Sequence, residues 1–228
     1  AGLTSVEHCE KNKDLAYYLN GHLPGEIAKI TNKNKIKFIH ISTDHIFDGN
    51  SKNYNEKSEP NPLNIYSKSK LLGENKVLKY NKNSLIIRTN FFGNGPDYKP
   101  SFSDRIVSSL AVNKSISLFK NVYYTPICIN ELADNTLKLL KLKASGIFNI
   151  SSNERITKYE FGLMLARKLN FNSKLLIPIN IEDKSDLVLR PKDMSLSNKK
   201  IELFTKSKIK PILSQLNDLL WYHMEDKT

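Results

Sequence analysis

The stretch that decides the fold is Ile36-Lys37-Phe38-Ile39-His40-Ile41-Ser42-Thr43-Asp44, an apolar run that ends in three polar residues. Such a run is typical of a buried strand, and residues 65–79 follow it with the spacing of an amphipathic helix. Further strands are predicted over residues 84–88 and 146–150, and further helices over 13–19 (restarting at Pro24), 102–112, 130–142 and 157–169. Strands that alternate with helices predict an α/β fold with a parallel sheet covered by helices.

Tyr66 and Lys70 stand four residues apart at the start of the helix predicted over residues 65–79. On a helix, that spacing places a phenol and an ammonium on the same face. Because a neighbouring cation favours the phenolate, we expect Lys70 to lower the pKa of Tyr66. Thr43, at the end of the preceding strand, would offer its hydroxyl to the same place. The three side chains therefore predict a proton-transfer site for a carbonyl or an alcohol.

Several ordered blocks around this site are similar to those of a known family. They are Thr43-Asp44-His45-Ile46-Phe47-Asp48-Gly49, Tyr54-Asn55-Glu56, Ile86-Ile87-Arg88-Thr89-Asn90-Phe91-Phe92-Gly93, Tyr124-Thr125-Pro126, Gly146-Ile147-Phe148-Asn149-Ile150 and Leu189-Arg190-Pro191. The chain resembles the extended short-chain dehydrogenase/reductases that act on nucleotide sugars, most closely the dTDP-4-dehydrorhamnose reductase group. The resemblance runs nearly from end to end.

The resemblance implies a Rossmann-type doubly wound parallel sheet with a smaller C-terminal α/β domain that binds the substrate. Residues 1–93 and 121–150 would form the NAD(P)-binding domain, and residues 94–120 and 151–228 the substrate-binding domain. The sequence begins with Ala1 and contains no G-x-G-x-x-G loop, which in the family holds the cofactor pyrophosphate. By resemblance, roughly the first sixty residues, with the first three strands, are missing. This truncated chain alone is therefore expected to be inactive.

The activity implied by the resemblance is reduction of the 4-keto group of a nucleotide-linked 4-keto-6-deoxy sugar, for surface polysaccharide biosynthesis. NADPH or NADH would supply the hydride, Tyr66 would protonate the reacting oxygen, and Thr43 and Lys70 would complete the catalytic set. The residues expected to contact the cofactor are Ala1, Gly2, Ser42, Tyr66, Lys70 and Thr89. The residues expected to contact the substrate are Asp44, His45, Asn90, Phe91 and Arg190.

Two other functions stay open within the resemblance. Nucleotide-sugar epimerases share the tyrosine–lysine pair, and net consumption of reduced cofactor would separate a reductase from an epimerase. A regulatory subunit of methionine adenosyltransferase has a reductase-like fold that need not catalyse a reaction. A 4,6-dehydratase is disfavoured, because that enzyme class carries an Asp-Glu pair where this chain has Asp44-His45.

The amino-acid composition limits the kinds of partner that this chain is expected to bind. The chain has 35 Lys and Arg against 23 Asp and Glu, a net charge of +12, yet the lysines are spread over its whole length. Because no basic block is interleaved with aromatic residues, nucleic-acid binding is not predicted. The sequence has no apolar run as long as a membrane span, and its two cysteines, Cys9 and Cys128, lie far apart, which favours a cytoplasmic protein without disulfides. The histidines do not cluster at metal-ligand spacings, so no metal is predicted, and a homodimer is left open.

Overall fold

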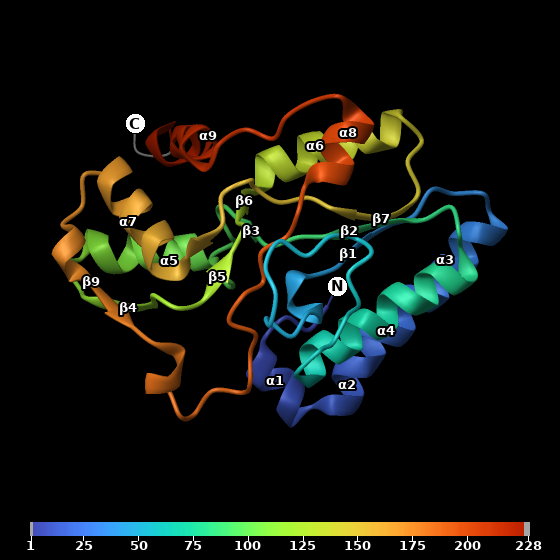
Figure 1. Ribbon diagram of the computed structural model, residues 1–228, viewed down its shortest axis with the longest axis horizontal. Coiled ribbons are helices and arrows are strands. Elements are labelled where there is room, and N and C mark those ends of the chain that lie inside the picture. Colours follow the sequence, from blue (N-terminus) through green and yellow to red (C-terminus); the bar gives the residue numbers. More distant parts are fainter. Residues whose placement is uncertain (1, 226–228) are drawn as a thin grey trace.

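The computed structural model describes residues 2–225 and, in the last helix, side chains as far as Asp218. It contains a unit built on a parallel sheet and, beside it, a unit built on smaller strand pairs (Figure 1). The helices are α1 Val6–Lys11, α2 Lys13–Tyr17, α3 Leu23–Lys33, α4 Ile65–Tyr80, α5 Phe102–Ala111, α6 Ile129–Lys141, α7 Lys158–Lys168, α8 Lys199–Thr205 and α9 Ile212–Glu225. The strands are β1 Ile39–Ile41, β2 Leu85–Arg88, β3 Phe91–Phe92, β4 Ile116–Phe119, β5 Tyr123–Tyr124, β6 Ile127–Cys128, β7 Gly146–Asn149, β8 Ile156–Thr157 and β9 Leu176–Ile179. The shorter turns are the π-helical η1 Tyr18–His22 and the 3₁₀ turns η2 Asp44–Ile46, η3 Ser173–Leu175 and η4 Ile181–Asp183.

The central sheet contains three parallel strands in the order β1-β2-β7. Leu85, Ile86 and Ile87 of the middle strand are fully buried, as expected for a parallel strand covered on both faces. Because parallel strands end at the same edge of a sheet, the segments that follow β1 and β2 lie next to each other. This carboxyl edge is where the predicted active-site residues converge.

Helices cover both faces of the central sheet (Figure 1). On one face, Ile86 packs with Ala28 of α3 and Val77 of α4. On the other face, Leu85 packs with Leu139 of α6 and with α8. Successive residues of β2 thus supply two separate cores, which fixes α4 firmly against the sheet.

The second unit gathers α5, α7 and α9 around the strand pairs β4–β9 and β5–β8. Phe161 of α7 is fully buried in its core, and its ring lies 5.0 Å from that of Phe92 and 6.1 Å from that of Tyr124. Helix α8 packs on the sheet unit through Ile201, although residues 151–228 were assigned to the substrate-binding domain from the sequence. The division into two domains itself stays a prediction.

The predicted central helices and strands agree with the structure, but two details differ. Pro24 does not restart a broken helix, because α2, η1 and α3 follow one another directly and Pro24 occupies the first turn of α3. The π-helical turn carries Asn20, whose side chain bonds to both backbone groups of Leu3 at 2.9 Å and to Ser69 of α4 at 3.0 Å. The sheet strand predicted from residue 36 is also shorter, since it begins only at Ile39.

Candidate active site

Thr43 lies where β1 ends, at the carboxyl edge of the sheet. Its backbone is extended (φ −140°, ψ 156°), and its hydroxyl caps η2 by accepting a hydrogen bond from the amide of His45 at 3.2 Å. The same hydroxyl can donate to Asp44 Oδ1, also at 3.2 Å. This cap turns the chain out of the sheet and holds the side chains of Asp44 and His45 beside Thr43.

The start of α4 is fixed by two sets of contacts. Asn64 and Ser67 form a capping box, in which each side chain accepts a hydrogen bond from the other residue's amide. Glu10 of α1 accepts a further bond from the amide of Ile65 at 2.9 Å. Because its first turn is held in this way, the helix presents Tyr66 to the site with little freedom to move.

Tyr66 and Lys70 reach the end of β1 from the same face of α4. The Tyr66 hydroxyl lies within interaction range of the Thr43 hydroxyl, and the Tyr66 ring lies edge-on to His45 with centroids 5.7 Å apart. One turn further along, the Lys70 ammonium donates to the carbonyl oxygen of Ile41 at 2.6 Å. The structure thus brings together the three side chains predicted to be catalytic.

Burial controls the protonation of this pair. It raises the pKa of Tyr66 to about 12, with the hydrogen bond from Thr43 opposing the rise and the Asp44 carboxylate adding to it. Burial also lowers the pKa of Lys70 to about 8, against the attraction of Glu74. The expected lowering of the Tyr66 pKa is therefore wrong, because desolvation of the phenol has the largest effect on this pKa and raises it. At neutral pH the tyrosine is a protonated phenol, the form that can donate a proton to a carbonyl oxygen.

The residues predicted to contact a cofactor differ in whether their side chains already have hydrogen-bond partners within the protein. Ser42 donates its hydroxyl hydrogen to Glu74 of α4. Thr89, at the end of β2, is buried, and its hydroxyl oxygen has no hydrogen-bond partner among the described residues. Gly2 lies close to the Asn20 side chain, where an added Cβ would be 3.2 Å from the amide oxygen. Ala1 lies outside the described residues.

Asp44 and Asn90 form one wall of the site. Asn90 follows β2 and donates to Asp44 Oδ2 at 2.7 Å. Burial raises the pKa of Asp44 to about 6, with Asn90, Lys158 and Thr43 opposing the rise. Burial lowers the pKa of His45 to about 3, so its imidazole is neutral at physiological pH. At neutral pH the wall therefore offers the Asp44 carboxylate and an uncharged imidazole.

Phe91 and Arg190, both predicted to contact the substrate, lie at the margin of this wall. Phe91 in β3 is 49% exposed, so its ring is accessible to a ligand. Arg190 forms an ion pair with Glu7 of α1, which links the late segment of the chain to its beginning. Its Nε atom is buried without a hydrogen-bond partner in the described part of the chain.

Lys158 and Tyr124 were missed by the sequence reasoning. Lys158 opens α7, and its ammonium lies 3.3 Å from the centroid of the Tyr124 ring and 4.9 Å from that of Phe102. It is close enough to Asp44 for the two charges to shift each other's pKa. The capping box of Thr157 predicts that the helix begins at Lys158, but no local pattern indicates which groups the side chain faces.

Comparison with known proteins identifies the family. The family model of the RmlD substrate binding domain matches residues 1–224. The chain belongs to this family. Both the predicted family and the predicted fold class are thereby confirmed.

Relatives of this RmlD-family chain include a probable reductase and a subunit of a methionine adenosyltransferase. The probable low-salt glycan biosynthesis reductase Agl14 of Haloferax volcanii is 32% identical over 206 residues, which cover 89% of this chain and 69% of that protein. Methionine adenosyltransferase 2 subunit beta of Danio rerio is 31% identical over 231 residues, covering 96% of this chain and 69% of that protein. 

Two solved structures share the fold. A hypothetical dTDP-4-dehydrorhamnose reductase from Sulfolobus tokodaii is 34% identical with a TM-score of 0.79, over 89% of this chain and 71% of that one. The dTDP-4-dehydrorhamnose reductase of Bacillus anthracis, in complex with NADP, superposes with a TM-score of 0.91 at 24% identity, over 97% of this chain and 78% of that one.

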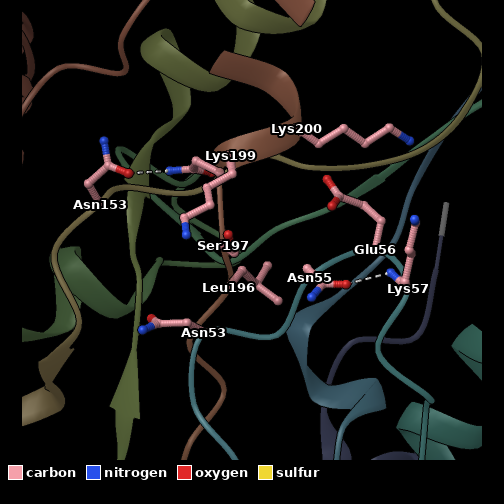
Figure 2. A pocket seen from close by; sticks show the side chains of 10 residues that line it. Asn53, Asn55, Glu56, Lys57, Asn153, Leu196, Ser197, Lys199 and Lys200 are labelled. Carbon is pink, nitrogen blue, oxygen red and sulfur yellow. Dashed lines mark hydrogen bonds between the residues drawn. The ribbon is translucent and has the colours of Figure 1, made fainter. Parts of the chain in front are cut away.

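A cavity of about 690 Å³ lies elsewhere in the RmlD-family chain (Figure 2). It is lined by residues 53 and 55–57, residues 196–200 and Asn153, and it includes none of the residues predicted for the active site. Over the described residues, no three His, Cys, Asp or Glu side chains are grouped as a metal site would require. The helices of that same part of the chain include none with the length and apolar character needed to cross a membrane.

Proposed function

We propose that this RmlD-family chain reduces the 4-keto group of a nucleotide-linked 4-keto-6-deoxy sugar with NADPH or NADH, in the biosynthesis of a surface polysaccharide. The observation that carries the proposal is the convergence of Tyr66, Lys70 and Thr43 at the end of β1, where the Tyr66 ring lies 5.7 Å from that of His45 and the Lys70 ammonium donates to the carbonyl oxygen of Ile41 at 2.6 Å. The similarity to the reductases of Haloferax volcanii and Sulfolobus tokodaii supports the same reaction class.

The residues present fit the nicotinamide end of a reduced dinucleotide. Lys70 has three N–H donors and uses one on the carbonyl of Ile41, so two are left for ribose hydroxyls. The buried hydroxyl of Thr89 supplies another polar group without a partner among the described residues. When bound, the nicotinamide would supply a hydride to C4 of the sugar.

The protein's own side chains manage the proton. Tyr66 is protonated at neutral pH and donates its hydroxyl hydrogen to the oxygen on C4. The single hydroxyl hydrogen of Thr43, which points to Asp44 in this structure, would turn to that oxygen and orient it by a second hydrogen bond. The Lys70 ammonium then stabilises the phenolate that the transfer leaves on Tyr66.

Tyr66→Phe tests this assignment. In protein expressed from the complete reading frame, with dTDP-4-keto-6-deoxyglucose, we expect kcat to fall by about 10²- to 10⁴-fold, since a positioned proton donor contributes that much. Turnover is followed by the absorbance of NAD(P)H, and binding of dTDP-glucose by calorimetry should stay unchanged. Tyr80→Phe, at the far end of the same helix, is the matched control. Unchanged turnover in the Tyr66 variant would exclude the mechanism.

A regulatory role is the second candidate, because the chain is 31% identical to methionine adenosyltransferase 2 subunit beta over 96% of its length. It is favoured if the protein co-purifies with a methionine adenosyltransferase and consumes no reduced cofactor with any keto sugar. An epimerase would interconvert nucleotide sugars without net consumption of cofactor.

A further inference from the structure

A group of polar side chains faces the catalytic residues from the second unit. It consists of Lys158 from α7 and Tyr124 from β5, which lie together, with the ammonium over the Tyr124 ring, and near enough to Asp44 for its charge to act on both. The Asp44 carboxylate is held in place by Asn90 at 2.7 Å and by the Thr43 hydroxyl at 3.2 Å. The mechanism above uses neither Lys158 nor Tyr124.

Both of these side chains carry hydrogen-bonding capacity that the described residues do not use. Tyr124 is 2% exposed, and its hydroxyl has no hydrogen-bond partner in the described part of the chain. The Lys158 ammonium lies 3.3 and 4.9 Å from the centroids of two aromatic rings and has no hydrogen bond or ion pair with the described residues. Buried polar groups are nearly always paired, so an unpaired hydroxyl beside a catalytic site points to a ligand group.

Asp44, Lys158 and Tyr124 together fit a neutral hydroxyl group of a ligand better than a phosphate. A hydroxyl can donate to the Asp44 carboxylate while it accepts a bond from Lys158 or Tyr124. A phosphate in the same place would be repelled by that carboxylate. The Asp44 carboxylate lies 3.2 Å from the Thr43 hydroxyl, which places a group bound to Asp44 near the reacting carbon.

We infer that Lys158 and Tyr124 bind the sugar hydroxyl on the carbon next to the reacting carbonyl, with Asp44 as its acceptor. The inference rests on the proposed function, because it takes C4 as the reacting carbon. In a 4-keto-6-deoxy sugar, C3 is the neighbour of C4 that carries a hydroxyl, since C5 carries the methyl group and the ring oxygen. Lys158 and Tyr124 then select nucleotide sugars with a free 3-hydroxyl.

Binding of two nucleotide sugars that cannot be reduced tests the inference. We would titrate dTDP-glucose and dTDP-3-deoxyglucose by calorimetry into protein expressed from the complete reading frame and into its Lys158→Met and Tyr124→Phe variants. Methionine keeps a long stem over the rings and removes the charge, and phenylalanine removes the unpartnered hydroxyl alone. Lys29→Met, at a lysine 4.4 Å above the Tyr80 ring and far from the site, is the matched control.

Lys158→Met should weaken binding of dTDP-glucose about tenfold or more, as expected for loss of a hydrogen bond from a charged group, and Tyr124→Phe by about fivefold. Neither variant should change binding of the 3-deoxy sugar, and Tyr124→Phe should not lower the melting temperature. Equal losses for both sugars, or no loss for either, would overturn the inference.

The outcome also separates this inference from the proposed function. If no keto sugar is reduced but the variants still discriminate between the two dTDP sugars, the reductase assignment fails and the hydroxyl contact stands. If keto sugars are reduced while the variants do not discriminate, the hydroxyl contact alone is wrong. Failure of the unaltered protein to bind either dTDP sugar overturns the contact as well.

Discussion

Removal of the buried carboxylate of Glu74 should cost this protein a large part of its stability. Glu74 in α4 and Arg88 in β2 form an ion pair at 2.7 Å, with side chains that are 1% and 3% exposed. Arg88 Nε adds hydrogen bonds of 3.0 and 3.2 Å to the two carboxylate oxygens. Ser42 donates to the same carboxylate. The pair therefore ties the helix that carries Tyr66 to the sheet and to the residue before Thr43.

The size of the expected loss in stability depends on the buried charge that Glu74→Gln leaves without a partner. Glu74→Gln keeps the volume but leaves the Arg88 guanidinium buried without a counter-charge, and Arg88 Nη1 already lacks a partner among the described residues. Removing one member of a buried ion pair typically costs about 3–5 kcal/mol. Because a glutamine oxygen can still accept one bond, we expect a loss of about 3 kcal/mol in the free energy of unfolding. That is a substantial part of the roughly 5–15 kcal/mol by which most domains are stable.

Urea unfolding followed by circular dichroism measures this loss. Glu26→Gln is the control, since Glu26 forms an exposed pair with Lys29 at 2.8 Å and its loss should leave the unfolding midpoint unchanged. The double variant Glu74→Leu, Arg88→Leu should be more stable than Glu74→Gln, because it leaves no buried charge. A loss below about 1 kcal/mol for Glu74→Gln, or a double variant less stable than the single one, would refute the reasoning.

Two further predictions concern stability. Burial lowers the pKa of His40 from 6.5 to about 3, so the unfolded chain binds more protons than the folded one between these values. The free energy of unfolding should therefore fall as the pH drops from 6.5 towards 3, by up to about 1.4 kcal/mol per pH unit for this residue, and His40→Leu should flatten that slope in urea titrations. Gly73→Ala would place a Cβ 2.2 Å from the carbonyl oxygen of Asn20, so α4 and η1 must separate. We expect a loss of about 1–3 kcal/mol in urea unfolding, and an unchanged midpoint would show that the two helices are not held together there.

The sequence predicts the parts of this protein that depend on local patterns. The apolar run of β2 and the helical spacing of α4 are visible in the sequence, and the spacing of Tyr66 and Lys70 places both on one face of α4. The capping box at Thr157 likewise marks the first residue of α7. By contrast, β3, β5, β6 and β8 contain two residues each, too few to produce a periodic pattern, and they form because their neighbours in space supply the pairing.

What the sequence could not predict depends on burial between distant segments. Lys70 as a neighbour of Tyr66 predicts a lowered pKa, yet the desolvation that raises this pKa comes from segments packed around the phenol. Lys158 stands more than one hundred residues after Asp44 in the chain, and the two approach each other only because α7 packs on the core of the second unit. The periodicity of apolar residues in the sequence does not indicate that two such distant residues lie close together.

The two sides of the active site are therefore built from independent structural supports. On the sheet side, Tyr66, Lys70 and Glu74 follow one another at intervals of four on α4, so the helix face that carries the proposed proton donor is also the face anchored to Arg88. On the other side, Tyr124 belongs to the core around Phe161, and the Lys158 ammonium lies over the Tyr124 ring. Substitutions at distant, unconnected positions act additively on stability. If Lys158 and Tyr124 contact the sugar as inferred, changes in the second unit alter which sugar is bound while the Glu74–Arg88 support of α4 stays as it is.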